Sequence, residues 1–449
     1  MLADFLRMWR LLLILLALAS ILLVGWIVVP MFSEATPFAL ESEPELQRLA
    51  LRAPADAHAI VLVRSFGPAW RRLDPLAGSL IESEGGREAL GAAAWLLGPS
   101  PVAFWTTPEG WGAAAAPDPL RALVMRLAGP FLPGAVIAQE DGIVLLNPAA
   151  DSMAAAVVPP WADGLPAHAF VVHLGGGGYP PLSRPAISAI TFDDSSSTAE
   201  ANGPGSSSER LRLVTRARSD GDSRTIPLDG KSLPANALLA IRFAEPPEAL
   251  LAIDRAVPIR LADFLADGGL AALYGIDTSG IVPRPRMAFG LPADDARAAE
   301  LLAAIDRLTI RGTVGFLLGM QPDRTRLVGE VEVTRREGIG LTVEFARRGG
   351  EFLFAFDSSS LEQLLIADPI PAGEGSGRWS LRASPDELRP VLHELGRNEA
   401  LRLFAREFSN EVRELERGMA ALPAARELRA RVVEGEGVAE LSAEAELAK

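Results

Sequence analysis

The sequence predicts an α+β protein: an N-terminal transmembrane helix, two related modules of antiparallel sheet covered by helices, and a C-terminal helix plus β-hairpin. Three observations support this prediction. A long uncharged apolar run lies near the N-terminus, and a Pro-Ala-x-Ala pattern precedes an apolar strand in each half of the chain. Alternation of apolar and polar residues marks two-faced strands, and apolar residues three and four apart mark helices.

The uncharged run from Leu11 to Ser33 is long enough to cross a bilayer core of about 30 Å at about 1.5 Å per helical residue. Arg7 and Arg10 precede the run, and Arg48 is the first basic residue after it. Because basic residues stay on the cytoplasmic side, we expect a single-pass membrane anchor with the N-terminus inside. The bulk of the chain is then periplasmic or otherwise extracytoplasmic, outside a bacterial inner membrane.

A cleaved signal peptide is the alternative reading of this run. The letters "ALAS" at 17–20 offer small residues for cleavage, but apolar residues continue to Phe32. A signal peptide's apolar region ends where cleavage begins, so the sequence favours an anchor.

Changes in composition along the chain predict the domain organisation. The segment 33–47 is acidic and contains two prolines, which is typical of a juxtamembrane spacer. The segment 193–209 is almost free of large apolar residues and is expected to be a long hairpin loop. The expected parts are a cytoplasmic tail 1–10, an anchor 11–32, a spacer 33–50, module one 51–217, a linker 218–232, module two 233–370, and a C-terminal helical hairpin and β-hairpin region 371–449 that packs on module two.

Module one is expected to begin with a strand and two helices. The periodicity predicts strands at 58–63, 101–106, 134–138, 142–146, 168–173, 186–192 and 210–217, and helices near 68–77, 81–97, 118–128 and 149–157. The uncharged stretch 89–108 is interrupted by "GPSP" at 98–101, which predicts a buried helix, a turn and a buried strand instead of a second membrane span.

Module two is expected to repeat this order. The pattern predicts strands at 237–243 and 285–290 and helices near 246–256, 260–272 and 293–307. In the following hairpin, Val331 and Val333 alternate with glutamates, and Val343 and Phe345 alternate with Thr342 and Glu344. This alternation predicts a sheet with one buried face and one face in water.

The C-terminal region carries clear helix signals. "SPDE" at 384–387 is a capping box, and Pro390 is expected to bend or shorten the helix that follows. Apolar residues from Leu401 to Leu422 form one stripe of a second helix, and alternation from Ala439 to Leu447 predicts a final hairpin.

The two modules share three stretches in the same order, which predicts an internal duplication. The segment 54–57 (Pro-Ala-Asp-Ala) matches 234–237 (Pro-Ala-Asn-Ala), 101–110 resembles 286–295, and 141–157 resembles 349–365. This layout resembles uncharacterised bacterial envelope proteins, in families of unknown function, that have an N-terminal anchor followed by Pro-Ala-Asp-Ala before a strand, repeated in a second half. The resemblance covers about residues 50–370 and brings no functional residues with it.

The sequence offers no motif for catalysis, for a cofactor or for a metal. The chain has no cysteine, which excludes disulfides, thiol nucleophiles and cysteine-ligated metals. His168 and His173 are five residues apart on one expected strand and therefore point to opposite faces, while His58 and His393 are isolated. No Gly-x-Ser-x-Gly motif and no phosphate-binding loop is present.

Binding is the better expectation. With a net charge of −14, 49% hydrophobic and 22% charged residues, the chain is that of a globular protein without the basic stripe of a nucleic-acid binder. Trp105 and Trp111 flank an expected loop, and with Trp70 and Trp161 they are candidates for a partner or ligand surface, although core packing is the alternative for each.

We therefore expect a non-catalytic, membrane-anchored envelope protein whose outer body binds or scaffolds a protein partner. Two alternatives stay open at this point: a carrier of an apolar ligand such as a lipid in a cleft between the modules, and a hydrolase that uses serine and aspartate side chains without a recognisable motif.

Overall fold

The computed structural model divides into two compact units: unit 1 contains residues 1–193 with 212–218, and unit 2 contains residues 194–211 with 219–449. The described residues are 31, 34–54, 56–80, 84–108, 110–128, 137–146, 164–174, 185–194, 209–218, 224–246, 265, 268–277, 284–292, 295–308, 323–338, 341–398, 410, 412–413, 416, 425–435 and 438–447. Apart from Met31, the expected anchor at 11–32 lies outside them. No helix among the described residues is long and apolar enough to cross a membrane.

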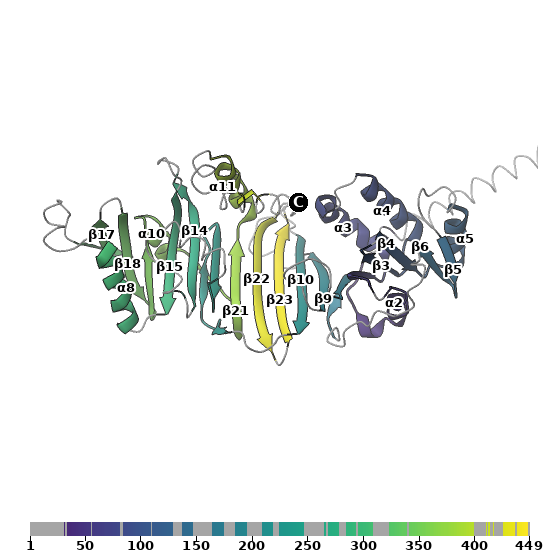
Figure 1. The fold of residues 1–449 in the computed structure, drawn as a ribbon, viewed down its shortest axis with the longest axis horizontal. Coiled ribbons are helices and arrows are strands. Elements are labelled where there is room, and N and C mark those ends of the chain that lie inside the picture. The colour runs from purple at the N-terminus through teal and green to yellow at the C-terminus, as the bar shows by residue number, and fades with distance from the viewer. Residues whose placement is uncertain are drawn as a thin grey trace, which may run out of the picture. The chain divides into compact units, whose positions relative to one another are not determined.

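Unit 1 is an antiparallel sheet with helices on both faces (Figure 1). Its strands are hydrogen-bonded in the order β9-β8-β2-β3-β4-β6-β5. Its elements are β1 (Phe38–Ala39), η1 (Leu40–Ser42), α2 (Pro44–Ala50), β2 (Ala59–Val63), α3 (Phe66–Leu80), α4 (Glu84–Leu97), β3 (Val102–Thr107), β4 (Gly110–Ala115), α5 (Pro119–Ala128), β5 (Ile137–Glu140), β6 (Ile143–Leu146), β7 (Pro166–Ala167), β8 (Ala169–His173), β9 (Ala186–Asp194) and part of β10 (Glu209–Arg218).

The central strand β2 shows why this sheet is covered twice. Ile60 and Leu62 pack with α2 in one apolar cluster, whereas Val61 and Val63 pack with α3 and α4 in the other. Helices therefore cover both faces of this sheet. A strand buried on both faces has apolar residues at nearly every position, as "AIVLV" does, because the two periodic faces merge into one apolar run.

The segment that the sequence assigns to a spacer forms β1, η1 and α2 from Phe38 onwards. Phe38, Leu40, Leu46 and Leu49 are all buried in the cluster that contains β2. This part of the chain therefore belongs to the folded body. The acidic residues that suggested a spacer lie on its surface, since Glu41 and Glu45 are exposed.

His168 ties the start of this segment to the sheet. Its Nε2 is 2.7 Å from the Ala35 carbonyl oxygen, and its Nδ1 accepts a hydrogen bond from the Phe192 N–H at 3.0 Å. The proton therefore sits on Nε2, which donates to Ala35. Burial lowers the pKa of His168, the Ala35 contact raises it in part, and the nearby charges of Arg72, Asp193 and Arg64 contribute less.

We expect this histidine to make unit 1 less stable in mild acid. The pKa of His168 is lowered from 6.5 in the folded state, so below pH 6.5 this imidazole is protonated in the unfolded chain more readily than in the folded chain. The contribution of His168 is complete above pH 6.5 and is lost as the pH falls towards the lower, folded pKa. Urea unfolding of the full chain, followed by tryptophan fluorescence, measures it. His168→Gln is expected to show a smaller loss of stability over this range, and an equal loss would contradict the assignment.

Unit 2 is a wider antiparallel sheet in the order β23-β22-β21-β13-β14-β15-β19-β18-β17-β16. A short pair of strands, β12 and β20, lies outside it, and β11 pairs with β21. The elements are β11 (Ile226–Pro227), β12 (Ser232–Pro234), β13 (Leu239–Phe243), β14 (Gly269–Asp277), β15 (Arg284–Pro292), α8 (Asp295–Leu308), β16 (Arg324–Val328), β17 (Val331–Gly338), β18 (Leu341–Arg348), β19 (Glu351–Ala355), α10 (Ser360–Ile366), β20 (Pro369–Pro371), β21 (Ser376–Ala383), α11 (Pro385–Arg397), β22 (Ala425–Gly435) and β23 (Val438–Leu447).

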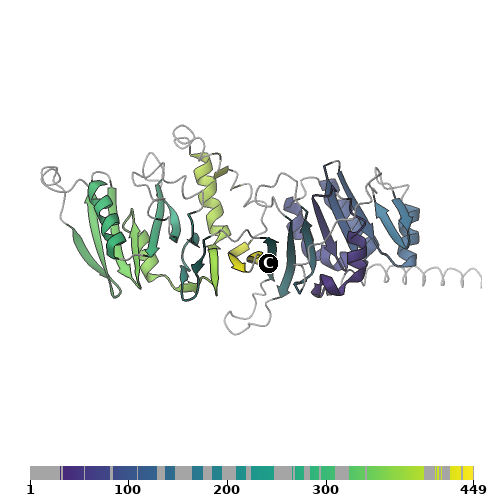
Figure 2. The same ribbon diagram turned by 60° about the horizontal axis from the view of Figure 1, so that its bottom comes forward.

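Both faces of this sheet are also covered. Leu361 and Leu364 of α10 pack on one face, and Leu301 of α8 packs on the other, where Phe289 and Phe354 stack with ring centroids 5.2 Å apart. Figure 2 shows α8 lying against the strands of this sheet. The second cluster is rich in phenylalanine and forms the core on its face of the sheet.

The structure differs from the expected elements at β14 and at β4. The stretch 269–272, expected at the end of a helix, belongs to β14, which pairs with β13 and β15 on either side. Its alanines and leucines favour a helix locally, but the hydrogen bonds and burial available between two strands outweigh that preference. The strand β4 at 110–115 was not expected at all, because "GWGAAA" has little strand character of its own.

The hairpin of β17 and β18 is confirmed, but its expected wet face is partly buried. The Glu344 side chain is fully buried, and its Oε2 accepts a hydrogen bond from Arg326 at 3.0 Å. Burial raises the pKa of Glu344, and Arg326 opposes this shift. Glu344 alternates with apolar residues but is not exposed to solvent, because Arg326 from β16 of the same sheet pairs with it.

The C-terminal region extends the sheet of unit 2. Strands β22 and β23 form the expected final hairpin, and β22 pairs with β21. Helix α11 packs Leu388, Leu392 and Leu395 against residues of β14. It continues past Pro390 to Arg397, so the proline does not end it, and Ser384 makes no side-chain capping bond. Most of the expected second helix lies outside the described residues.

Candidate functional site

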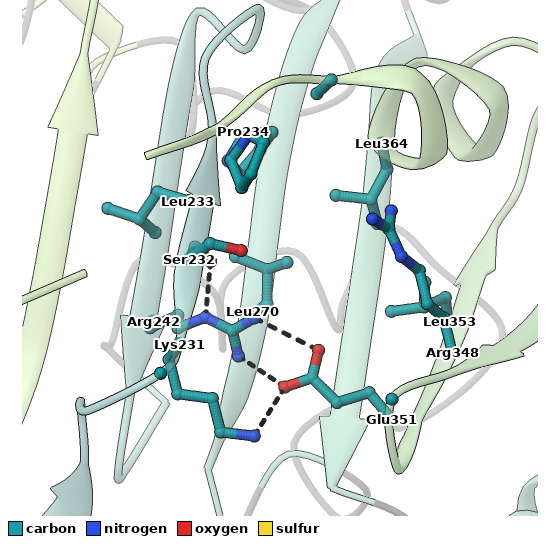
Figure 3. A pocket seen from close by; sticks show the side chains of 14 residues that line it. Lys231, Ser232, Leu233, Pro234, Arg242, Leu270, Arg348, Glu351, Leu353 and Leu364 are labelled. Carbon is teal, nitrogen blue, oxygen red and sulfur yellow. Dashed lines mark hydrogen bonds and ion pairs between the residues drawn. The ribbon is translucent and has the colours of Figure 1, made fainter. Parts of the chain in front are cut away.

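Unit 2 contains a cavity of 240 Å³ between the β12–β20 pair, the strands β13, β14 and β19, and helix α10 (Figure 3). Its lining combines charged residues with leucines. The charged side chains are Lys231, Arg242, Arg348 and Glu351, so three positive charges face one negative charge. The whole site is built by residues of unit 2.

Arg242 and Glu351 form a bidentate ion pair in the wall of the cavity. The Arg242 Nη1 donates to Glu351 Oε1 at 2.7 Å, and Nη2 donates to Oε2 at 3.2 Å. The Arg242 Nε donates to the Ser232 carbonyl oxygen at 2.7 Å, which orients the guanidinium. Both side chains are largely buried, with 8% and 14% exposed. Such a paired geometry holds the carboxylate in one position.

Lys231 is a second partner of the same carboxylate. Its Nζ lies 3.1 Å from Glu351 Oε1, and its side chain is 35% exposed. Burial alone would raise the pKa of Glu351, but the hydrogen bonds and charges of Arg242, followed by those of Lys231, outweigh burial and lower it. Glu351 is therefore ionised at neutral pH and fully engaged by two cations.

The tight hairpin between β18 and β19 places Arg348 beside this pair. Gly349 and Gly350 make the turn with φ angles of 57° and 78°, which glycine adopts without steric cost. Arg348 is the cross-strand partner of Glu351. It is exposed, and its Nη1 donates to the Leu365 carbonyl oxygen at 3.0 Å.

The lining of the cavity also has an apolar part. Leu233, Leu270, Leu353 and Leu364 are all buried and line it. Gly290 lies behind this wall: a Cβ built there would be 3.0 Å from Leu353 Cδ2 and 3.7 Å from Glu351 Oε2. The glycine therefore leaves room that any larger residue would take from the leucines or from the carboxylate.

The arrangement is suited to binding and poorly suited to acid–base catalysis. A general base works best with a pKa near the working pH, and the pKa of Glu351 is moved away from neutrality. A surplus of positive charge beside an apolar wall instead attracts an anion that also carries an apolar part. In the part of the chain that the structure describes, no group of three histidine, aspartate or glutamate side chains is arranged to hold a metal ion.

The tryptophans chosen from the sequence do not share a surface. Trp105 on β3 is 3% exposed and Trp70 on α3 is 8% exposed, so both lie in apolar clusters of unit 1. Trp111 on β4 is 54% exposed. It pairs with Thr106, the neighbour of Trp105, and the two rings therefore project to opposite faces of the sheet. Trp161 lies outside the described residues.

The residues of the cavity were missed by sequence reasoning, although two signals existed. Arg242 stands inside the apolar strand "LAIRF", between Ile241 and Phe243. Lys231 is one of two lysines in a chain whose other basic residues are all arginines. A charge inside a buried strand and a rare residue type are each weak signals, and Glu351 is far from both in the sequence.

Comparison with known proteins adds no further information on the site. No protein-family model matches the sequence, and neither the curated proteins nor the solved structures give a significant match.

Proposed function

We propose that the protein is a non-catalytic, single-pass membrane-anchored protein of the bacterial envelope, with an extracytoplasmic binding body. This body consists of two copies of one α+β module, of which the first serves structure and the second carries a binding site. The resemblance to anchored envelope proteins of unknown function and the apolar N-terminal run support the location. The comparison of the two units supports the division of roles.

The strand order supports the duplication. In unit 1 the order β9-β8-β2-β3-β4-β6-β5 corresponds, strand by strand, to β22-β21-β13-β14-β15-β19-β18 in unit 2. Each unit also has one short antiparallel pair outside the sheet, β1 with β7 and β12 with β20, at the same places in the chain order. A shared order of this length is unlikely to arise twice by accident of folding rules alone.

Two of the three sequence matches fit this correspondence. The first aligns β2 with β13, and the third aligns the hairpin β5–β6 with β18–β19, whose turns both have two residues at positive φ. The second match, 101–110 with 286–295, sets β3 against β15, whereas the strand order pairs β3 with β14. That match is therefore not part of the duplication.

The single observation that carries the proposal is a set of replacements at matching positions. Where unit 1 has buried apolar residues, unit 2 has the groups that form or adjoin the cavity. The matching pairs are Leu62 with Arg242, Ile143 with Glu351, Phe170 with Ser380, and Ala114 with Gly290.

The pairing registers support each of these equivalences. Leu62 lies opposite Phe170 as Arg242 lies opposite Ser380. Ala114 lies opposite Leu145 as Gly290 lies opposite Leu353. A buried ion pair is on average no more stabilising than a well-packed apolar core. Its presence in one copy alone therefore favours a role in binding.

We expect the full chain to stay with the membrane fraction after washing with alkaline carbonate. Leu16→Arg combined with Leu23→Arg is expected to release it, because each arginine at the centre of a spanning helix costs about 2.5–3.5 kcal/mol of insertion free energy. The intact mass of the membrane-bound chain tests the anchor against cleavage, since an anchor retains residues 1–20. Release of the unsubstituted chain by carbonate would contradict the proposal.

The binding role is tested by purification in a mild detergent. We expect a second envelope protein to co-purify with the full chain from its native host, at a fixed ratio. Purification of the chain alone, as a monomer, would exclude the scaffold form of the proposal.

A further inference from the structure

We infer that the cavity of unit 2 is a binding site for a small carboxylate that carries a short apolar chain. This inference deepens the proposed function by naming the ligand class of the second copy. It depends on the charge, the apolar wall and the size of the cavity, each of which limits the ligand independently.

The first argument is the supply of hydrogen-bond donors on cations. Glu351 neutralises only one of the three positive side chains in the lining. The Lys231 ammonium has three N–H groups and directs one to Glu351, and Arg348 directs Nη1 to a backbone carbonyl. Both side chains reach solvent. Lys231 lies beside Arg242 and Glu351, whereas Arg348 lies beside Leu353 and Leu364 (Figure 3). Lys231 can therefore bind a carboxylate by charge-assisted hydrogen bonds, and Arg348 adds a second positive charge to the lining.

The second argument is the apolar wall. Leu270 and Leu353 are 2% and 4% exposed, and with Leu233 and Leu364 they form the apolar part of the lining. Leu353 and Leu364 lie on the side of the cavity away from Lys231 (Figure 3). An inorganic anion would leave these leucines facing water. A hydrocarbon chain attached to the carboxylate would cover them, at about 0.8 kcal/mol per buried methylene group.

The third argument is size. Pockets for drug-sized ligands measure about 300–1,000 Å³, and this cavity measures 240 Å³. A nucleotide or a long acyl chain does not fit inside. Gly290 also keeps this volume open, since the alanine that unit 1 has at the matching position would place a methyl group 3.0 Å from Leu353 Cδ2.

The rarity of lysine permits a direct test. Lys231 and Lys449 are the only lysines in the chain, so an amine-reactive reagent followed by peptide mass spectrometry reports on two side chains and the N-terminus. The full chain in a lipid nanodisc is labelled with and without hexanoate. At about ten times the dissociation constant, mass action predicts about tenfold slower labelling of Lys231, and no change at Lys449.

Two variants and two other compounds make the result specific. Arg348→Gln is expected to weaken the protection by hexanoate about tenfold, because it removes one of the positive charges of the lining. Arg347→Gln, an exposed neighbour that does not line the cavity, is the matched control and is expected to change nothing. Hexanol and inorganic phosphate, at the concentration of hexanoate, are expected to protect weakly.

Each other outcome overturns the inference. Equal protection by hexanol would show that the ligand needs no carboxylate, and equal protection by phosphate would show that it needs no apolar chain. Absence of protection by hexanoate would show that the cavity does not bind this ligand class. A chain that remains membrane-bound and retains its protein partner while Lys231 stays unprotected would overturn this inference alone and leave the proposed function in place.

Discussion

Replacing Arg242 with alanine is expected to lower the free energy of unfolding by about 3–5 kcal/mol, because the substitution leaves a buried carboxylate without its main partner. Glu351 is 14% exposed and has two hydrogen bonds from the Arg242 guanidinium. Lys231 still reaches one oxygen of the carboxylate, but it cannot replace the bidentate contact or the bond to the Ser232 carbonyl.

The double variant Arg242→Leu with Glu351→Ile is expected to behave differently. It copies the apolar pair that unit 1 has at the matching positions, Leu62 and Ile143, both at most 2% exposed. Replacing a buried ion pair by apolar residues of similar volume is neutral or stabilising by about 1–4 kcal/mol. In the same variant hexanoate is expected no longer to protect Lys231 from labelling, since Arg242 and Glu351, which line the cavity, are replaced.

Urea unfolding of the full chain measures both effects. Tryptophan fluorescence, to which Trp379 of this sheet contributes, and circular dichroism are the two separate probes. The single variants Arg242→Leu and Glu351→Ile complete a double-mutant cycle, whose coupling energy isolates the pair. A double variant as unstable as Arg242→Ala would mean that the ion pair itself holds unit 2 together. The comparison with unit 1 would then lose its force as an argument for binding.

Local patterns in the sequence predicted the elements whose signals lie within a few residues of each other. The hairpin of β17 and β18, helix α8 and the strand β2 follow directly from periodicity and turn residues. The strands β4 and β14 did not, because "GWGAAA" and "GLAALYGID" become strands only through their neighbours. Glu344 shows the same limit for burial, since its partner Arg326 comes from a different strand.

The candidate site could not be assembled from the sequence, because Lys231, Arg242 and Glu351 meet only through the pairing of the strands. Lys231 directly precedes β12 and Arg242 lies on β13, whereas Glu351 follows Arg242 by 109 residues. Strands β14 and β15 lie between β13 and β19 in the sheet, so the Arg242 and Glu351 side chains meet only because both are long enough to reach across two strands. The apolar residues of unit 1 that match Arg242 and Glu351 are likewise defined by the strand registers of both sheets.

Trp105→Ala is expected to destabilise unit 1 by about 3–5 kcal/mol, the usual cost of removing a large aromatic side chain from a packed core. The ring is 3% exposed and lies across Gly112 on the neighbouring strand, where any Cβ would overlap the indole. It also packs in the cluster that contains the buried residues of α2. The loss creates a cavity between the helix and the sheet that the surrounding backbone can close only in part.

Trp111→Ala is the matched comparison on the same hairpin. The ring is 54% exposed, so its removal is expected to change the free energy of unfolding by no more than about 0.5 kcal/mol. Urea unfolding separates the two variants, and co-purification of the envelope partner with the folded Trp111→Ala chain measures any role in binding. A full yield of partner would show that Trp111 is not part of the binding surface. A reduced yield at unchanged stability would place the partner at Trp111 on the β3–β4 hairpin. An exposed indole is the kind of residue that contributes most at protein interfaces, which is why the exposed tryptophan, and not the buried one, carries the test.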